Sequence, residues 1–263
     1  MAGDLDAYTS WSPSPNFSSR TRSDDAAIVH TVESDLRDSL AVSLAGPDWF
    51  GSTKAGTSPH AIVGPVSRVG TVLRKFKSWA VGSPGNNITY NIEQTGRAAF
   101  TRAQWLTTEG LAQISNVALV IADWAKAKGA TKPPTRGTRD ELRRYANGEN
   151  VGLRYYGHVD VTDTLGGTTH TDPGDQYPYD VLQAQINLHF GIGPTPTPVQ
   201  EDDMPLNAAD KAWIQTAITN TIRKEAGPAV WRTKLKGGFL NAGAGAALAD
   251  VFTQVRKLRG QGK

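Results

Sequence analysis

The segment Ala-Ala-Ile-Val-His-Thr, residues 26–31, is the most informative part of this chain. Its first four residues are apolar, and such a short apolar run is typical of a buried β-strand. The run leads into a histidine, His30. Because α/β sheets commonly present functional groups at the carboxyl ends of their strands, the segment predicts both a buried strand and a candidate site residue.

Three further segments carry strand patterns. Residues 61–66 form another short apolar run. Residues 71–76 and 88–93 have mixed or alternating apolar positions, as half-buried strands do. These segments predict the remaining strands of the sheet.

Helical patterns separate and follow the strands. The longest covers residues 101–128, where Thr101 and Gln104 have the spacing of a capping box. Its expected buried stripe consists of Leu111, Ile114, Val117, Ala118 and Ile121. Shorter helices are expected over residues 138–148 and 179–190. Mixed strands with intervening helices predict the α/β class, with a mixed central β-sheet flanked by helices.

The length of 263 residues suits one medium-sized domain with a small appendage. Residues 191–203 are rich in proline, glycine and acidic residues, which predicts an extended linker after a domain of residues 1–190. Residues 204–263 carry ten basic against three acidic residues, a net charge of +7 within a chain of net charge +3. This region is expected to be helical and to face an anionic partner, unless it is merely a solvated helical surface.

Composition excludes several classes of protein. Hydrophobic content of 38% with 20% charged residues suits a soluble globular chain. The longest apolar run, residues 117–122, is far too short to cross a bilayer of roughly 30 Å. The absence of cysteine rules out disulfides and thiolate chemistry, and the N-terminus lacks the apolar core of a secretory signal. We therefore expect synthesis in a reducing cytoplasm.

Two histidines and an aspartate form the most suggestive set of polar residues. His158 follows Tyr-Tyr-Gly and is expected to open a loop, residues 159–169, which leads to His170 and Asp172. Together with His30, His158 and Asp172 would supply two imidazoles and one carboxylate. Three such ligands are typical of catalytic zinc, because the fourth tetrahedral position stays open for water. The alternative is that each histidine is a hydrogen-bonded structural residue.

Four landmarks in order resemble zinc amidases of the N-acetylmuramoyl-L-alanine type, the superfamily that includes amidase-type phage lysozymes and peptidoglycan recognition proteins. The landmarks are Ile-Val-His-Thr at 28–31, Ser-Pro-His and an apolar strand at 58–63, Trp-Ala-Val-Gly at 79–82 with Asn-Ile-Glu at 91–93, and Gly-His-Val-Asp at 157–160 with Asp-Pro-Gly at 172–174. They span nearly the whole first domain.

The resemblance implies a role for each matching residue. His30, His158 and Asp172 would be the Zn²⁺ ligands. Glu93 would be the catalytic carboxylate, the alternative being a solvent-facing residue of an edge strand. His170 would stabilise the developing oxyanion, or else only shape the turn that follows it.

Substrate contacts are implied for Thr31 and Trp79, although a tryptophan more often belongs to a core. Two positions depart from the family pattern. Pro59 stands where some members have a tyrosine, which places more of the acid–base role on Glu93. Ala80 stands where other members have a histidine, so one substrate contact is missing.

The implied activity is hydrolysis of the amide bond between N-acetylmuramic acid and L-alanine in bacterial peptidoglycan. The expected setting is a phage endolysin, made without a signal peptide in the host cytoplasm and acting on the cell wall after release. Residues 204–263 would bind an anionic wall polymer, and no nucleic-acid partner is expected because no binding motif is present. The alternatives are a non-catalytic peptidoglycan-binding module of the same fold and a bacterial autolysin.

Overall fold

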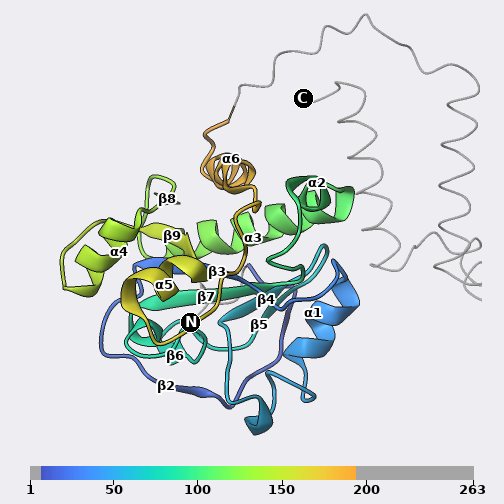
Figure 1. Ribbon diagram of the computed structural model, residues 1–263, viewed down its shortest axis with the longest axis horizontal. Coiled ribbons are helices and arrows are strands. Elements are labelled where there is room, and N and C mark those ends of the chain that lie inside the picture. Colours follow the sequence, from blue (N-terminus) through green and yellow to red (C-terminus); the bar gives the residue numbers. More distant parts are fainter. Residues whose placement is uncertain (1–6, 194–263) are drawn as a thin grey trace, which may run out of the picture. The chain divides into compact units, whose positions relative to one another are not determined.

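The computed structural model describes residues 7–193. Most of the expected linker, residues 194–203, and the basic region 204–263 lie outside the described residues. A mixed seven-stranded sheet forms the centre of the domain, in the order β1-β5-β4-β7-β3-β9-β8, and only β4 and β5 are antiparallel (Figure 1). The strands are β1 Ser10–Trp11, β3 Ala26–Thr31, β4 Ala61–Val63, β5 Arg68–Gly70, β7 Thr89–Gln94, β8 Thr135–Arg136 and β9 Arg154–Gly157. The predicted fold class is confirmed.

A two-stranded antiparallel ribbon and a set of helices complete the domain. The ribbon pairs β2, Phe17–Ser19, with β6, Phe76–Ser78. The helices are α1 Asp38–Ala45, α2 Arg102–Trp105, α3 Thr108–Ala127, α4 Arg139–Ala146, α5 His158–Leu165 and α6 Tyr179–His189, with short 3₁₀ turns η2 Thr53–Ala55 and η3 Gly85–Asn87.

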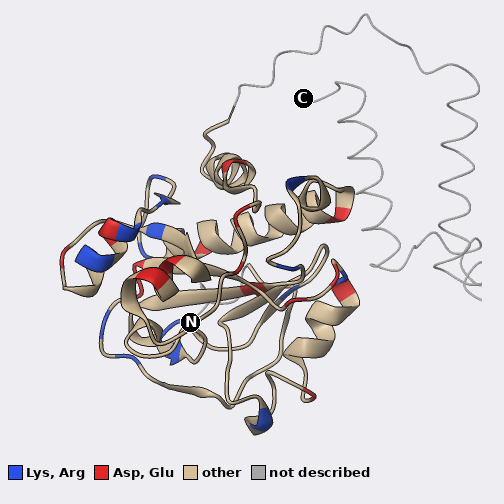
Figure 2. Cartoon of the chain, in the orientation of Figure 1, with Lys and Arg blue, Asp and Glu red and all other residues tan. Residues whose placement is uncertain are grey.

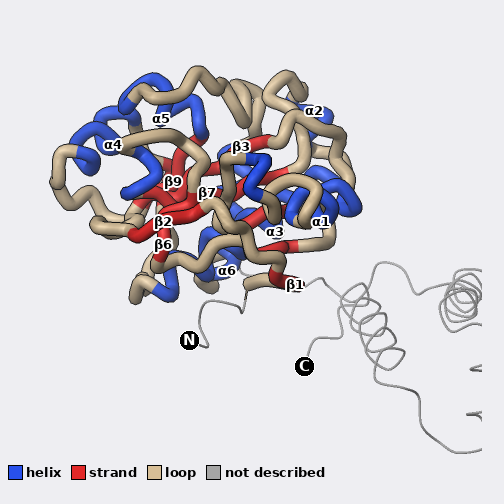
Figure 3. Tube along the Cα trace, turned by 90° about the horizontal axis from the view of Figure 1, so that it is seen from below, coloured by secondary structure: helices blue, strands red, loops and turns tan. Residues whose placement is uncertain are grey.

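Helices cover both faces of the sheet, and alternate residues of β3 supply the two cores. Ala27 and Val29 pack in the cluster that contains the buried residues of α3 and α6. Ala26 and Ile28 pack in a second cluster with residues of α4 and α5. Figure 3 shows the strands between these two pairs of helices. Because successive side chains of a strand point to opposite faces, the alternation places His30 on the α5 side of the sheet.

The predicted helix over residues 101–128 is in fact two helices. The predicted capping box at Thr101 is present but caps only the single turn of α2. Thr107 then provides a second N-cap, accepting a hydrogen bond from the backbone N–H of Gly110, and α3 begins there. The junction is tight, since a Cβ on Gly110 would lie 2.1 Å from the carbonyl oxygen of Trp105. Leu111 falls in the first turn of α3 and is 42% exposed, so the prediction that it is buried is wrong.

Two other local predictions are also corrected. Residues 71–75 form a connection between β5 and β6, in which the backbone N–H groups of Thr71 and Val72 both donate to the carbonyl of His60, and only Phe76 of the predicted segment lies in a strand. The expected loop over residues 159–169 begins as helix α5. Asp160 makes that helix possible by accepting a hydrogen bond from the backbone N–H of Gly157 at 2.8 Å.

Most charged residues lie on the helices and loops (Figure 2), and strands β1, β2, β3 and β4 carry none. The three adjacent strands β3, β4 and β7 contain a single carboxylate, Glu93. A lone carboxylate in the middle of a sheet favours a functional role, because burying an unpaired charge is costly. Within residues 7–193, no helix has the length and apolar character needed to cross a bilayer.

His60, which precedes β4, is fully buried between two backbone groups that fix its charge state. Its Nδ1 accepts a hydrogen bond from the backbone N–H of Asn91, and its Nε2 lies 3.1 Å from both the Phe76 carbonyl and the Arg20 guanidinium. A proton on Nδ1 would face the Asn91 N–H, so the ring must be neutral. Burial, together with the charge of Arg20, lowers the pKa of His60 from 6.5 to about 3.

We expect the metal-free protein to lose stability as the pH falls below 6.5. The unfolded chain then binds a proton at His60 that the folded chain takes up only near pH 3. The free energy of unfolding should fall by up to about 1.4 kcal/mol per pH unit for each such histidine. Urea denaturation between pH 7.5 and 5.5 measures this slope. His60→Gln should show a slope smaller by about half a proton on average over this range, rising toward one proton at its acid end, and an unchanged slope would contradict the assignment.

Candidate metal centre

The candidate ligands converge because of how three strands are paired. β3 is parallel to β7 with His30 opposite Glu93, and parallel to β9 with Val29 opposite Gly157. The residue after Gly157, His158, therefore lies beside His30 at the carboxyl end of the sheet, where it begins α5. Asp172 comes from the loop before α6, and its carbonyl accepts a hydrogen bond from the backbone N–H of Val159.

His30, His158 and Asp172 form a compact buried group. The Nδ1 atoms of the two histidines are 3.0 Å apart. Asp172 Oδ1 lies 3.3 Å from His158 Nδ1, and Asp172 Oδ2 lies 3.8 Å from His30 Nδ1. One potential ligand atom from each residue lies within 4.8 Å of the others, and all three side chains are buried. The three residues could thus hold a metal ion.

A relay of hydrogen bonds fixes the tautomer of His30. His60 Nδ1 accepts from the backbone N–H of Asn91, and the Ser78 hydroxyl lies 3.1 Å from the same nitrogen. The oxygen of Ser78 then accepts from the Asn91 side-chain amide at 2.9 Å, which turns Asn91 Oδ1 toward His30 Nε2 at 3.1 Å. His30 Nε2 therefore carries the proton, and its Nδ1 lone pair points at the candidate site.

Asp172 is held by a backbone hydrogen bond, whereas the outer nitrogen of His158 has no hydrogen-bond partner among the described residues. Asp172 Oδ2 accepts a hydrogen bond from the backbone N–H of Thr31 at 2.9 Å. Burial alone would raise the pKa of Asp172, but the contacts with His158, His30 and Thr31 lower it below its ordinary value. His158 Nε2 is buried without a hydrogen-bond partner among the described residues, so its tautomer depends on what binds at Nδ1.

The donor set fits zinc. Two imidazole nitrogens and one carboxylate are ligands that zinc accepts, and three of them leave one tetrahedral position open. Burial, and the proximity of His158, lower the pKa of His30 to about 3, so this ring is neutral and able to bind a cation at physiological pH. Asn91 provides the outer hydrogen bond that metal-bound histidines typically make.

Glu93 lies at the edge of this group. Its Oε1 is 3.9 Å from His30 Nδ1, while its Oε2 is buried without a hydrogen-bond partner among the described residues. Burial raises the pKa of Glu93 well above its ordinary value, and the charges of Asp172 and Glu33 raise it further. A carboxyl group with a raised pKa and an unused oxygen is suited to exchange protons with a bound water or substrate.

His170 and Thr31 both contact the group, whereas Trp79 lies outside it. The ring of His170 stacks on that of His158 with centroids 4.6 Å apart, and its Nδ1 is 3.5 Å from Asp172 Oδ1. The Thr31 hydroxyl donates to Glu33 at 2.7 Å, so this side chain is already engaged. Trp79 makes no contact with the three candidate ligands; it is 38% exposed, and its indole N–H donates to Ser18.

An open groove of about 700 Å³ joins His170 to Trp79. Its walls come from residues 56–57, 79–82 and 167–170, with Asn86 between them. The volume is within the usual range for ligand sites. Of the predicted site residues, His170 and Trp79 line this groove, and the ring of His170 stacks on that of the candidate ligand His158.

Two residues of the site have no role in the sequence prediction. Asn91 belongs to the Asn-Ile-Glu landmark, and its spacing of two from Glu93 places both side chains on one face of β7. Strand alternation was thus a usable signal for Asn91. Glu33 has a positive φ of 53° and accepts hydrogen bonds from Thr31 and Ala98, and no sequence pattern pointed to it.

The fold resembles known hydrolase structures at low sequence identity. The hydrolase AmiA of Staphylococcus aureus, in complex with its ligand, superposes with a TM-score of 0.50 at 19% identity, over 73% of this chain and 90% of that one. The PlyG catalytic domain superposes with a TM-score of 0.41 at 12% identity, over 71% of this chain and 92% of that one. The endolysin N-acetylmuramoyl-L-alanine amidase LysCS of Clostridium intestinale superposes with a TM-score of 0.37 at 12% identity, over 67% of this chain and 98% of that one. No family model and no curated protein sequence matches.

The likeness to AmiA concerns the fold: a mixed sheet flanked by helices, shared over most of both chains. In this chain that fold carries a buried His-His-Asp group at the carboxyl ends of its central strands. This buried group could hold a metal ion, and its donor atoms are ones that zinc accepts.

Replacing Asn91 should weaken metal binding without removing a ligand. Asn91→Ala frees His30 to adopt either tautomer, and we expect zinc affinity to fall roughly 10- to 100-fold. Asn91→Asp keeps the acceptor and should bind zinc about as well as the unaltered chain. Competition with a chromogenic chelator measures the affinities. Asn116→Ala, which removes a half-buried amide that bonds only to Gly64, Pro65 and Arg68, is the matched control; equal losses in both alanine variants would refute the role of Asn91.

Proposed function

We propose that this chain is a zinc-dependent N-acetylmuramoyl-L-alanine amidase. The observation that carries the proposal is the convergence of His30, His158 and Asp172 on one buried point, with Glu93 beside them. The sequence landmarks that resemble this family, together with the fold shared with AmiA, support the assignment of the bond. A non-catalytic binding module would not require an unpaired buried carboxylate next to a complete set of ligands.

In the proposed reaction, His30, His158 and Asp172 hold the ion. Bound zinc would lower the pKa of a water molecule and polarise the lactyl carbonyl of the substrate. Glu93, whose carboxylate lies beside the candidate ligands, accepts the proton of the attacking water and passes it to the leaving nitrogen of L-alanine. His170, exposed and stacked on His158, donates a hydrogen bond to the carbonyl oxygen as negative charge develops there.

The proposed substrate approaches along the groove between His170 and Trp79. Thr31 contributes through its backbone N–H, which orients Asp172. We further propose a phage endolysin, made in the host cytoplasm and acting on the wall after release, with residues 204–263 bound to an anionic wall polymer. The support for this setting is the family resemblance and the net charge of +7 in that region. A bacterial autolysin would use the same chemistry.

Asp172→Ala should abolish both zinc binding and amidase activity. The variant loses one of three ligands, so we expect at least a roughly 100-fold loss of zinc affinity. Metal content and newly freed L-alanine amino groups from purified peptidoglycan are the two measurements. Asp175→Ala, an exposed neighbour, is the control and should behave like the unaltered chain. Release of sugar reducing ends instead of L-alanine termini would keep the metal centre and refute the assigned bond.

Glu93→Gln should separate chemistry from metal binding. Glutamine has the size of glutamate but cannot take up the proton, so kcat should fall about 10²- to 10⁴-fold while zinc content stays near one per chain. Glu109→Gln makes the same chemical change at an exposed position of α3 and should leave both quantities unchanged. Full activity in Glu93→Gln would assign the proton transfer to another group.

A further inference from the structure

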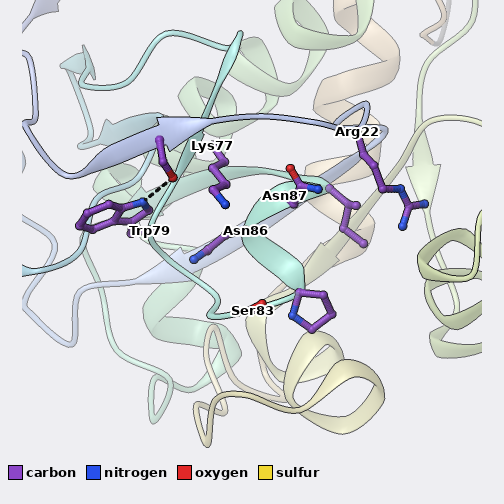
Figure 4. Close-up of a pocket in the computed structure, with 9 residues that line it drawn as sticks. Arg22, Lys77, Trp79, Ser83, Asn86 and Asn87 are labelled. Carbon is purple, nitrogen blue, oxygen red and sulfur yellow. Dashed lines mark hydrogen bonds between the residues drawn. The ribbon is translucent and has the colours of Figure 1, made fainter.

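A second hollow, of about 480 Å³, adjoins the groove on the other side of Trp79 (Figure 4). It is bounded by β2, β6 and the turn η3, and it shares Trp79 and Asn86 with the groove that reaches His170. A molecule that occupies the groove can therefore extend into this hollow. None of its lining residues is a candidate ligand or the proposed acid–base residue.

Asn86 presents a fixed hydrogen-bond donor to the hollow. Its side-chain oxygen accepts two hydrogen bonds, from the backbone N–H groups of Ala80 at 2.9 Å and Val81 at 2.8 Å. These two donors fix the orientation of the amide, because only the oxygen can accept. The amide nitrogen is then directed away from the backbone and has no partner among the described residues.

Lys77 and Ser18 add two further donors. Lys77 is half-buried on β6 and makes no hydrogen bond or ion pair with any described residue, and Figure 4 shows its side chain extending alongside Asn86. The Ser18 oxygen accepts the indole N–H of Trp79 at 3.0 Å, which leaves its own hydroxyl hydrogen free to donate. The hollow thus combines an ammonium group, an amide N–H and a hydroxyl.

The charges around the hollow are positive. No Asp or Glu occurs among its lining residues within the described part of the chain. Arg22 lies at its other end, where the guanidinium donates to the neutral carbonyls of Tyr145 and Ala146, so its charge is not cancelled there. The nearest acidic residues in sequence, Asp24 and Asp25, form ion pairs with Lys128.

We propose that this hollow binds an oxyanion, a carboxylate or a phosphate, through Lys77, Asn86 and Ser18. A set of donors with no competing acceptor matches a group that only accepts, and hydrogen bonds to an ionised group are the stronger kind. That the oxyanion belongs to the cell-wall strand being cut rests on the proposed function. Binding there would hold the strand in register with the groove beside His170.

The binding itself is tested without catalysis. Acetate and inorganic phosphate are titrated into the full-length, zinc-loaded chain while ¹H–¹⁵N spectra follow the Asn86 side-chain amide and the Trp79 indole. We expect saturable shifts of both signals, and Lys77→Gln should weaken the affinity about fivefold or more. Lys75→Gln is the control, because the ammonium of Lys75 lies over the Phe76 ring and Lys75 does not line the hollow. This variant should bind acetate and phosphate with the affinity of the unaltered chain. Shifts that do not saturate, or equal losses in both variants, would overturn the proposal.

The source of the oxyanion is tested on the wall. Lys77→Gln should raise KM about fivefold with kcat unchanged, the pattern expected when binding but not chemistry is lost. An effect that persists on walls stripped of phosphodiester polymers assigns a carboxylate of the peptide. An effect seen only on untreated walls assigns a phosphate. An unchanged KM on both substrates, with saturable anion binding in the spectra, would overturn the link to the wall. Absence of amidase activity in the unaltered chain would refute the proposed function and leave the anion-binding result intact.

Discussion

Strand β3 is hydrogen-bonded in parallel to β7 on one side and to β9 on the other, so three strands end together at the same edge of the sheet. This pairing places His30 level with Glu93 and brings His158 beside them. If one strand slipped by one residue against its neighbour, its side chains would point to the opposite face of the sheet. A slip by two residues would move them a full pleat along the strand. The geometry of the candidate centre is therefore set by backbone pairing, and Asp172 needs only to be delivered by a loop.

Burial on both faces explains why the polar residues of the sheet are connected to one another. β3 and β7 lie beneath helices on both sides. A polar group buried there without a hydrogen-bond partner lowers the free energy of unfolding by about 1–3 kcal/mol. His60, Ser78 and Asn91 satisfy each other in a single relay that begins at the carbonyl of Phe76. The same relay orients His30, so the hydrogen bonds that make the core tolerable also prepare the candidate ligand. Glu93 is the exception, with one buried oxygen left unpaired.

Sequence patterns predicted the parts of the site that depend on local order. His30 was identified because it follows an apolar strand, the capping box at Thr101 was identified from its spacing to Gln104, and a helix start was predicted at Thr138. The role of Asn91 was not predictable in the same way, because its partners Ser78 and His30 lie 13 and 61 positions away. The sequence also did not show that α3 begins at Thr107 or that Asp160 stabilises the start of α5. Each feature depends on a single hydrogen bond, and threonine and aspartate occur at many positions where they make no such bond.

Some positions of this fold need a particular side chain, whereas most need only an apolar one. This difference explains why the fold is recognisable at 19% identity although no family model matches the chain. Most core positions require only an apolar side chain of suitable volume, and many combinations of residues meet that requirement. The candidate centre requires particular atoms at particular places, yet only a few residues supply them. The walls of the groove and of the hollow beside Trp79 come from the two-stranded ribbon, loops and turns, all outside the seven-stranded sheet. Lys77, Ser18 and Asn86 lie on those walls, so the features that set which molecule binds can change while the strand pairing that positions the candidate ligands stays the same.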